Sequence, residues 1–137
     1  MKNNALQQEL TICSCYHSEE SKKLLELNVA YTKNMNPGFR HSWIIANNTF
    51  QDFRGRNEIE GEYITVIPTR HFKEPRPWAR SYNHSTSLNI IKDHIKTRFV
   101  LFLDPDLYIV KKNWMREVLA HMEKQKLSFF GVPWHPK

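Results

Sequence analysis

Apolar and polar positions change in blocks along the chain, and the blocks predict strands that take turns with helices. Three segments carry apolar residues at helical spacing: one after Ser18, one after Ser85, and one over 113–125. Apolar runs of strand character separate them, at 10–16, 43–46, 63–67, 99–103 and 127–132. Strands that alternate with helices in this way are typical of a parallel sheet.

The predicted fold is therefore α/β, with a mostly parallel sheet and helices on both faces, in a Rossmann-like arrangement. The run Phe99–Leu103 is almost continuously apolar, as expected for a strand buried on both faces. The chain ends just after the last expected strand, with no closing helix. We therefore expect residues 1–137 to be the N-terminal portion of a single longer domain.

Local signals place the helices more closely. Ser18 can cap the first helix, and Glu19 and Glu20 suit its first turn. Its apolar face contains either Leu25 or Leu27, which the spacing leaves open. Ser85 is expected to cap the second helix. The Pro-containing stretch 71–78 is expected to be a surface loop.

Composition narrows the class of protein. Hydrophobic residues make up 40% of the 137 positions and charged residues 25%, as in globular domains. No apolar stretch approaches the roughly 20 residues of a spanning helix, and the N-terminus has no apolar signal core. We expect a cytoplasmic protein, either free or at the inner face of a membrane. Cys13 and Cys15 lie on one strand without a second pair for zinc, and are expected to be reduced core residues.

The net charge of +6 fits nucleic acid, an anionic membrane surface or a phosphorylated substrate as partner. The basic residues are scattered and form no block of five or more, so most are expected to be solvated surface. Arg70, Arg76 and Arg80 flank the expected loop at 71–78 and are candidates for phosphate contacts.

Two carboxylates one residue apart, Asp104 and Asp106, follow the apolar strand at 99–103. Ligands of open α/β sheets bind at the carboxyl ends of strands, and hard cations such as Mn²⁺ or Mg²⁺ share oxygen ligands with phosphates. Pro105 keeps Asp104 extended and has no N–H to donate. Two interpretations stay open at this point, a divalent cation on a diphosphate and an ordinary turn.

The order of the strand ends strengthens the first interpretation. The first strand ends at Cys15-Tyr16-His17 and the second at Asn47-Asn48. A helix containing Asn89 then leads to the Asp-Pro-Asp strand, and Asp104 follows Asn89 by 15 positions (104 − 89 = 15). In this order and spacing the chain resembles the family 2 glycosyltransferases, which have the GT-A fold, over nearly its whole length.

The resemblance implies a donor site for a nucleotide-diphosphate sugar. Cys15, Tyr16 and His17 would lie around the base, and Asn47 or Asn48 occupies the position where the family usually has a base-reading Asp. Asn89 is the Asn of the family's Arg-Asn pair, whereas Leu88 replaces its Arg.

For the two aspartates the resemblance implies separate roles. Asp104 corresponds to the aspartate near the ribose. Asp106 corresponds to the ligand of Mn²⁺ or Mg²⁺ on the diphosphate, with Asp104 nearby. The implied acceptor is a glycan or a lipid-linked hydroxyl, and no nucleic acid is expected as partner. The family's general base lies further along the sequence, and nothing acidic follows Glu123, so this chain alone is expected to be inactive.

Two other functions remain open. One is a non-catalytic basic module that binds nucleic acid or anionic lipid. The other is a phosphatase with an aspartate nucleophile, a class that also ends a strand in Asp-x-Asp. That class places its motif on the first strand and has Thr or Val where this chain has Tyr108.

Overall fold

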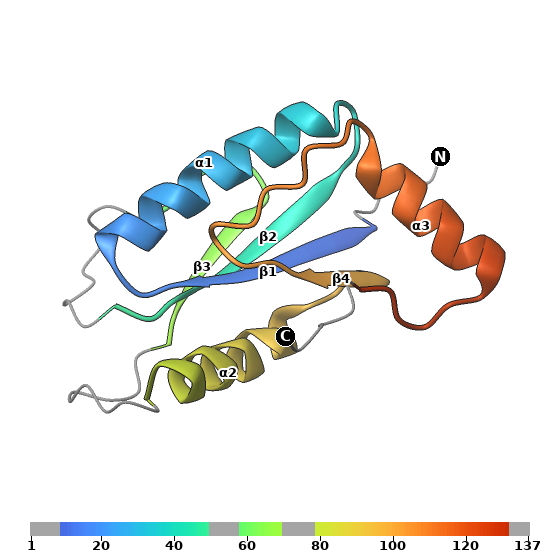
Figure 1. Cartoon of the computed structure of the whole chain (residues 1–137). Coiled ribbons are helices and arrows are strands. Elements are labelled where there is room, and N and C mark those ends of the chain that lie inside the picture. The colour runs from blue at the N-terminus through green and yellow to red at the C-terminus, as the bar shows by residue number, and fades with distance from the viewer. Residues whose placement is uncertain (1–8, 50–57, 70–78, 132–137) are drawn as a thin grey trace, which may run out of the picture.

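A computed structural model describes residues 9–49, 58–69 and 79–131 of the chain (Figure 1). Strands and helices alternate through these segments, as the sequence pattern predicts. The elements are β1 (Leu10–Tyr16), α1 (Glu19–Met35), β2 (His41–Asn47), β3 (Ile64–Pro68), α2 (Ala79–Ile91), the short 3₁₀ helix η1 (Lys92–His94), β4 (Phe99–Phe102) and α3 (Trp114–Gln125).

The four strands form one parallel sheet in the order β3-β2-β1-β4. β1 lies inside the sheet and all seven of its residues are buried. Its register partners begin at His41 on β2 and Phe99 on β4. The expected α/β fold with a parallel sheet is therefore confirmed.

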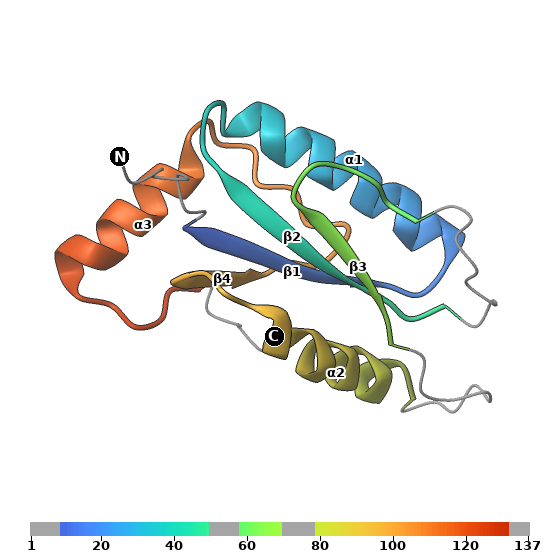
Figure 2. The ribbon, with the colours of Figure 1, turned by 180° about the vertical axis from the view of Figure 1, so that it is seen from behind.

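Helices cover both faces of the sheet (Figures 1 and 2). On one face, α1 and α3 pack on the strands through a cluster that includes Leu25, Met115 and Leu119. On the opposite face, Ile91 of α2 packs against Cys13 and Cys15 of β1. Strand alternation sends neighbouring residues of β1 to different faces, which is why one strand contributes to both clusters.

The start of α1 forms as its sequence predicts. The Ser18 hydroxyl accepts a hydrogen bond from the backbone N–H of Ser21, and the Ser21 hydroxyl accepts one from the N–H of Ser18. Glu19 and Glu20 lie in the first turn, where the helix dipole favours negative charge. Of the two open positions, Leu25 is the buried one and Leu27 is exposed.

The start of α2 was wrong in the sequence interpretation. The helix begins at Ala79, so Ser85 lies within it and does not cap it. The reason is that the buried positions of this helix, Asn83, Ser87 and Ile91, are mostly polar. A search for apolar periodicity therefore misses its first turns.

The strand expected at 127–132 does not form within its described part. Lys126 adopts a left-handed conformation with φ 53° and ends α3, and residues 127–131 pair with no strand among the described residues. Phe129 and Phe130 are exposed there. The loop expected at 71–78 lies outside the described residues, as do Arg70 and Arg76.

No helix within the described segments has the length and apolar character that crossing a bilayer requires. On the outer side of β4, the described residues supply no further strand. Val100 and Phe102 of β4 are exposed.

Candidate functional site

The Asp104-Pro105-Asp106 turn lies where the chain path through the sheet reverses. From β1 the chain passes by way of α1 to β2, and β3 follows on the far side of β2. From β3 it returns by way of α2, on the opposite face, to β4 on the other side of β1. Adjacent crossovers on opposite faces leave an opening between the carboxyl ends of β1 and β4, the usual ligand position in open α/β sheets.

The pairing of β1 with β4 extends one residue beyond β4 and fixes the start of the turn. The backbone N–H of Leu103 donates to the carbonyl of Cys13 at 3.0 Å. The Ser14 hydroxyl donates to the carbonyl of Leu103 at 2.7 Å. These two hydrogen bonds therefore fix the position of Asp104 next to β1.

The side chain of Asn28 on α1 contacts the backbone of the Asp104-Pro105-Asp106 turn. Its amino group lies 3.4 Å from the carbonyl oxygen of Asp104, 3.2 Å from that of Pro105 and 2.8 Å from that of Leu107. The side-chain oxygen of Asn28 accepts a hydrogen bond from the Thr32 hydroxyl, and this bond orients the side-chain amide. Asn28 is itself fully buried, so its amide depends on these partners inside the fold.

Tyr108 adds a second attachment between the turn and α1. Its hydroxyl donates to the carbonyl of Leu24 at 2.8 Å, and its ring meets Tyr31 edge to face. Because the backbone is held on this side, the carboxylates of Asp104 and Asp106 are free to face solvent, and both residues are exposed.

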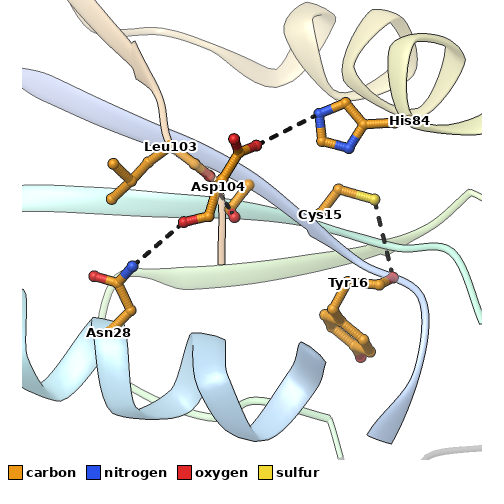
Figure 3. Close-up of polar contacts among 7 residues, drawn as sticks. Cys15, Tyr16, Asn28, His84, Leu103 and Asp104 are labelled. Carbon is orange, nitrogen blue, oxygen red and sulfur yellow. Dashed lines mark hydrogen bonds and ion pairs between the residues drawn. The ribbon is translucent and has the colours of Figure 1, made fainter. Parts of the chain in front are cut away.

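His84 of α2 approaches Asp104 from the other face of the sheet (Figure 3). Its Nε2 lies 3.9 Å from Oδ1 of Asp104, with 42% of the His84 side chain and 68% of the Asp104 side chain exposed. Figure 3 shows the Asp104 carboxylate directed to α2 and its backbone carbonyl directed to Asn28. Asp104 thus joins the two helices that flank the opening.

Two buried cysteines, Cys13 and Cys15, lie on β1 towards its carboxyl end. The Cys15 thiol lies 3.9 Å from the carbonyl of Tyr16. Burial raises the pKa of Cys15 to about 11, opposed in part by a hydrogen bond with Ser87. Burial likewise raises the pKa of Cys13 to about 11. Both cysteines are free and buried, so the expectation of core residues is confirmed, and neither is a thiolate near neutral pH.

Tyr16 and His17 differ in exposure. Tyr16 is buried, and its hydroxyl has no hydrogen-bond partner among the described residues. Burial, and then the charge of Glu58, raise the pKa of Tyr16. His17 is exposed, and its backbone N–H donates to the Ser21 hydroxyl at the start of α1.

The end of β2 supplies amides. Asn47 is the register partner of Tyr16, and its side-chain oxygen accepts from both the N–H and the hydroxyl of Thr49. The backbone N–H of Asn48 donates to the Tyr16 carbonyl, which holds the ends of β1 and β2 together. Asn47 and Asn48 are both buried.

Asn89 is not brought to the opening by any described contact. The buried face of α2 contains Asn83, Ser87 and Ile91, and a residue two positions after Ser87 points about 200° around the helix from it. Asn89 is accordingly exposed. Leu88, one position earlier, packs against the core. His84, which the sequence interpretation did not single out, lies close to Asp104 from α2.

Asp104 and Asp106 supply carboxylates, the donor type that a cation shared with a ligand would use. The described residues contain no group of three or more His, Cys, Asp or Glu side chains placed to hold a metal ion. A cation on a diphosphate needs one or two carboxylates, with phosphate oxygens and water as its other ligands. Asp104 and Asp106, exposed on a braced turn, match that requirement in donor type and accessibility.

Sequence reasoning also missed Asn28, and a signal for it exists. Asn28 lies three positions after Leu25 and four before Thr32, on the buried face of α1. A polar residue on the buried face of a helix needs a partner inside the fold. Its partner here is the turn that bears the two aspartates.

No protein-family model, curated protein or solved structure matches this chain. The resemblance to glycosyltransferases therefore depends on the order and spacing of its own residues.

Proposed function

We propose that the chain is the donor-binding part of a glycosyltransferase. It binds a nucleotide-diphosphate sugar through Mn²⁺ or Mg²⁺, for transfer to a hydroxyl of a glycan or a lipid-linked acceptor. The observation that carries the proposal is the position of Asp104 and Asp106 at the carboxyl end of β4, beside β1, where the sheet order reverses. Two exposed carboxylates at that point suit a cation that bridges a diphosphate.

Asp106 and Asp104 would hold the cation, which supplies Lewis-acid stabilisation of the departing nucleoside diphosphate. Asn28 and Tyr108 act through the backbone: they hold the turn against α1, so that the backbone that carries the two carboxylates does not have to be ordered on binding. The tight pairing of β1 and β2 through Asn48 and Tyr16 gives the base end of the site the same rigidity. No general base is assigned within this chain.

The test is calorimetric titration of UDP, GDP, CDP and dTDP into the full chain, with and without Mn²⁺. We expect one nucleotide to bind in a metal-dependent way and Asp106→Asn to weaken that binding at least about tenfold, since the variant loses the charge that pairs with the cation. Asp93→Asn is the matched control, because Asp93 is also exposed but lies in η1, before the start of β4.

Absence of metal-dependent binding by a protein that is folded by circular dichroism would contradict the proposal. Equal binding by wild type and Asp106→Asn would show that the cation does not depend on this turn. Either result would leave Asp104-Pro105-Asp106 as an ordinary turn.

A further inference from the structure

The outer edge of β4 presents backbone groups that can pair with another strand. The backbone N–H groups of Phe99 and Leu103 both donate to carbonyls on the β1 side of the strand. Backbone groups alternate in direction along a strand, so Val100 and Phe102 point theirs away from β1. The described residues supply no strand on that side. An open edge of this kind is a template for a strand of another chain.

The side chains along this edge are apolar. Phe99 and Leu101 pack against the cluster under α1 and α3, so Val100 and Phe102 lie on the opposite face of the sheet. The described cluster on that face, to which Ile91 of α2 belongs, includes no residue of β4. Val100 is therefore 42% exposed and Phe102 52%. β4 also contains neither a charged residue nor a proline, the usual means by which an edge strand avoids pairing.

β4 is complementary to a second copy of itself in the antiparallel direction. When Leu101 faces Leu101 of the second copy, Val100 of each chain faces Phe102 of the other. Both residues direct their N–H and C=O groups outward, so each facing pair can exchange two hydrogen bonds. Their side chains then form cross-strand pairs of a β-branched and an aromatic residue, which stabilise sheets. A twofold axis at Leu101 relates the two chains and closes the assembly at two copies.

The charges around β4 favour the same direction. Lys96 and Arg98 precede the strand, Asp104 and Asp106 follow it, and all four residues are exposed. Antiparallel pairing brings the basic end of one copy to the acidic end of the other, whereas parallel pairing would bring like charges together. Arg98 also pairs with Glu123 of its own chain, and 71% of its side chain stays exposed.

We propose that the outer edge of β4 is a homodimer interface, at which a second copy of this chain adds its β4 in the antiparallel direction and the two sheets become one. The edge lies on the side of β4 away from β1, so the dimer does not depend on the proposed function. Because β4 has only 4 residues, the interface is small and the dimer is of the weak class that depends on concentration.

The first test is sedimentation equilibrium of the full chain between about 1 and 300 µM, a range in which weak dimers assemble. We expect the average mass to rise from that of one chain towards that of two. Val100→Lys places a charge on the edge and should weaken the dimer at least about tenfold. Val110→Lys is the matched control, because Val110 is 77% exposed but lies outside the sheet, and it should leave the dimer unchanged.

The second test is disulfide formation under a mild oxidant, which reports the direction and register of the pairing. Leu101→Cys should give a dimer linked through position 101, since the two copies of this residue face each other. Val100→Cys should not, because Val100 faces Phe102 of the other chain. The native Cys13 and Cys15 are buried, and wild type measures any contribution from them.

A folded wild-type chain that stays monomeric over the whole range overturns the proposal, as does a series of assemblies larger than two copies. Equal effects of Val100→Lys and Val110→Lys would place the contact elsewhere and also overturn it. Linking of Val100→Cys as readily as Leu101→Cys would overturn the antiparallel register. Should Val100→Lys not fold, the two cysteine variants decide.

Discussion

At the scale of single residues, Asn28 links the framework to the candidate site. Its buried amino group lies within hydrogen-bond distance of three backbone carbonyls in the turn that bears Asp104 and Asp106. The presence of a polar residue on the buried face of α1 is thus explained by a tertiary contact. This contact could be suspected from the sequence, because Asn28 falls on the buried stripe, but its partner could not be named.

We predict that Asn28→Ala lowers the free energy of unfolding by about 1–3 kcal/mol, because the turn loses the donor to its carbonyls and the buried Thr32 hydroxyl loses its acceptor. The midpoint of urea denaturation measures the change. Asn34→Ala is the control, since Asn34 is exposed on the same helix and should change stability by less than about 0.5 kcal/mol. Equal effects of the two substitutions would contradict a special role for Asn28.

The two cysteines make stability depend on pH at the alkaline end. Burial raises the pKa of Cys13 and of Cys15 from 9.0 to about 11. A thiol whose pKa is higher in the folded state stabilises the fold fully below pH 9, and that contribution is lost as pH rises from 9 to 11. By pH 10 the loss is on the order of 1 kcal/mol for each thiol.

Urea denaturation of wild type and of the Cys13→Ala, Cys15→Ala double variant at pH 8 and pH 10 tests this dependence. The fall in stability between the two pH values should be smaller in the variant. A fall of the same size in both proteins would assign it to other groups, of which Tyr16 is the first candidate because its pKa is also raised.

At the scale of elements, helix starts differ in how well local sequence defines them. The start of α1 is a local motif, in which Ser18 and Ser21 exchange hydrogen bonds, and it could be read from the sequence. The start of α2 is not local, because its buried residues Asn83 and Ser87 are polar and Ser87 bonds to Thr69 at the end of the sheet. Which side of α2 is buried is therefore decided by how the helix packs on the sheet, and not by its own sequence.

We predict that Ser18→Ala destabilises the protein by about 1 kcal/mol, because the first turn of α1 loses its side-chain acceptor. Ser18→Thr keeps a hydroxyl and should restore most of the stability. Thermal unfolding followed by circular dichroism compares the three proteins. A Thr variant as unstable as the Ala variant would mean that the hydroxyl is not the important group.

At the scale of the whole molecule, the distribution of charge bears on the expectation that nucleic acid is not a partner. Several basic side chains of the described segments are paired with carboxylates: Lys22 lies 3.4 Å from Glu26, and Arg98 lies 2.6 Å from Glu123. Lys111 pairs with Glu117. These pairs set acidic groups among the basic ones, so these side chains do not form a purely basic surface for a phosphate backbone.

We therefore expect binding to random duplex DNA at physiological salt to be no tighter than about 10⁻⁵ M and to weaken steeply as salt is added, as for non-specific association. Fluorescence anisotropy with a labelled duplex measures it. Tight DNA binding together with no nucleotide binding would support the basic module in place of the donor site. A phosphatase of the aspartate class has Thr or Val at the position of Tyr108. In this chain the Tyr108 hydroxyl donates a hydrogen bond to the backbone of α1.

The sequence by itself determined the α/β class, the capped start of α1 and the carboxylates after β4. These features depend on local periodicity, on contacts within one turn and on residue type, all of which act over a few positions. Only the tertiary structure decided where Asn28, His84 and Asn89 lie relative to the turn that bears the two aspartates. Whether such a residue meets the turn depends on the crossing of helices over the sheet, which residues far apart in the sequence set together.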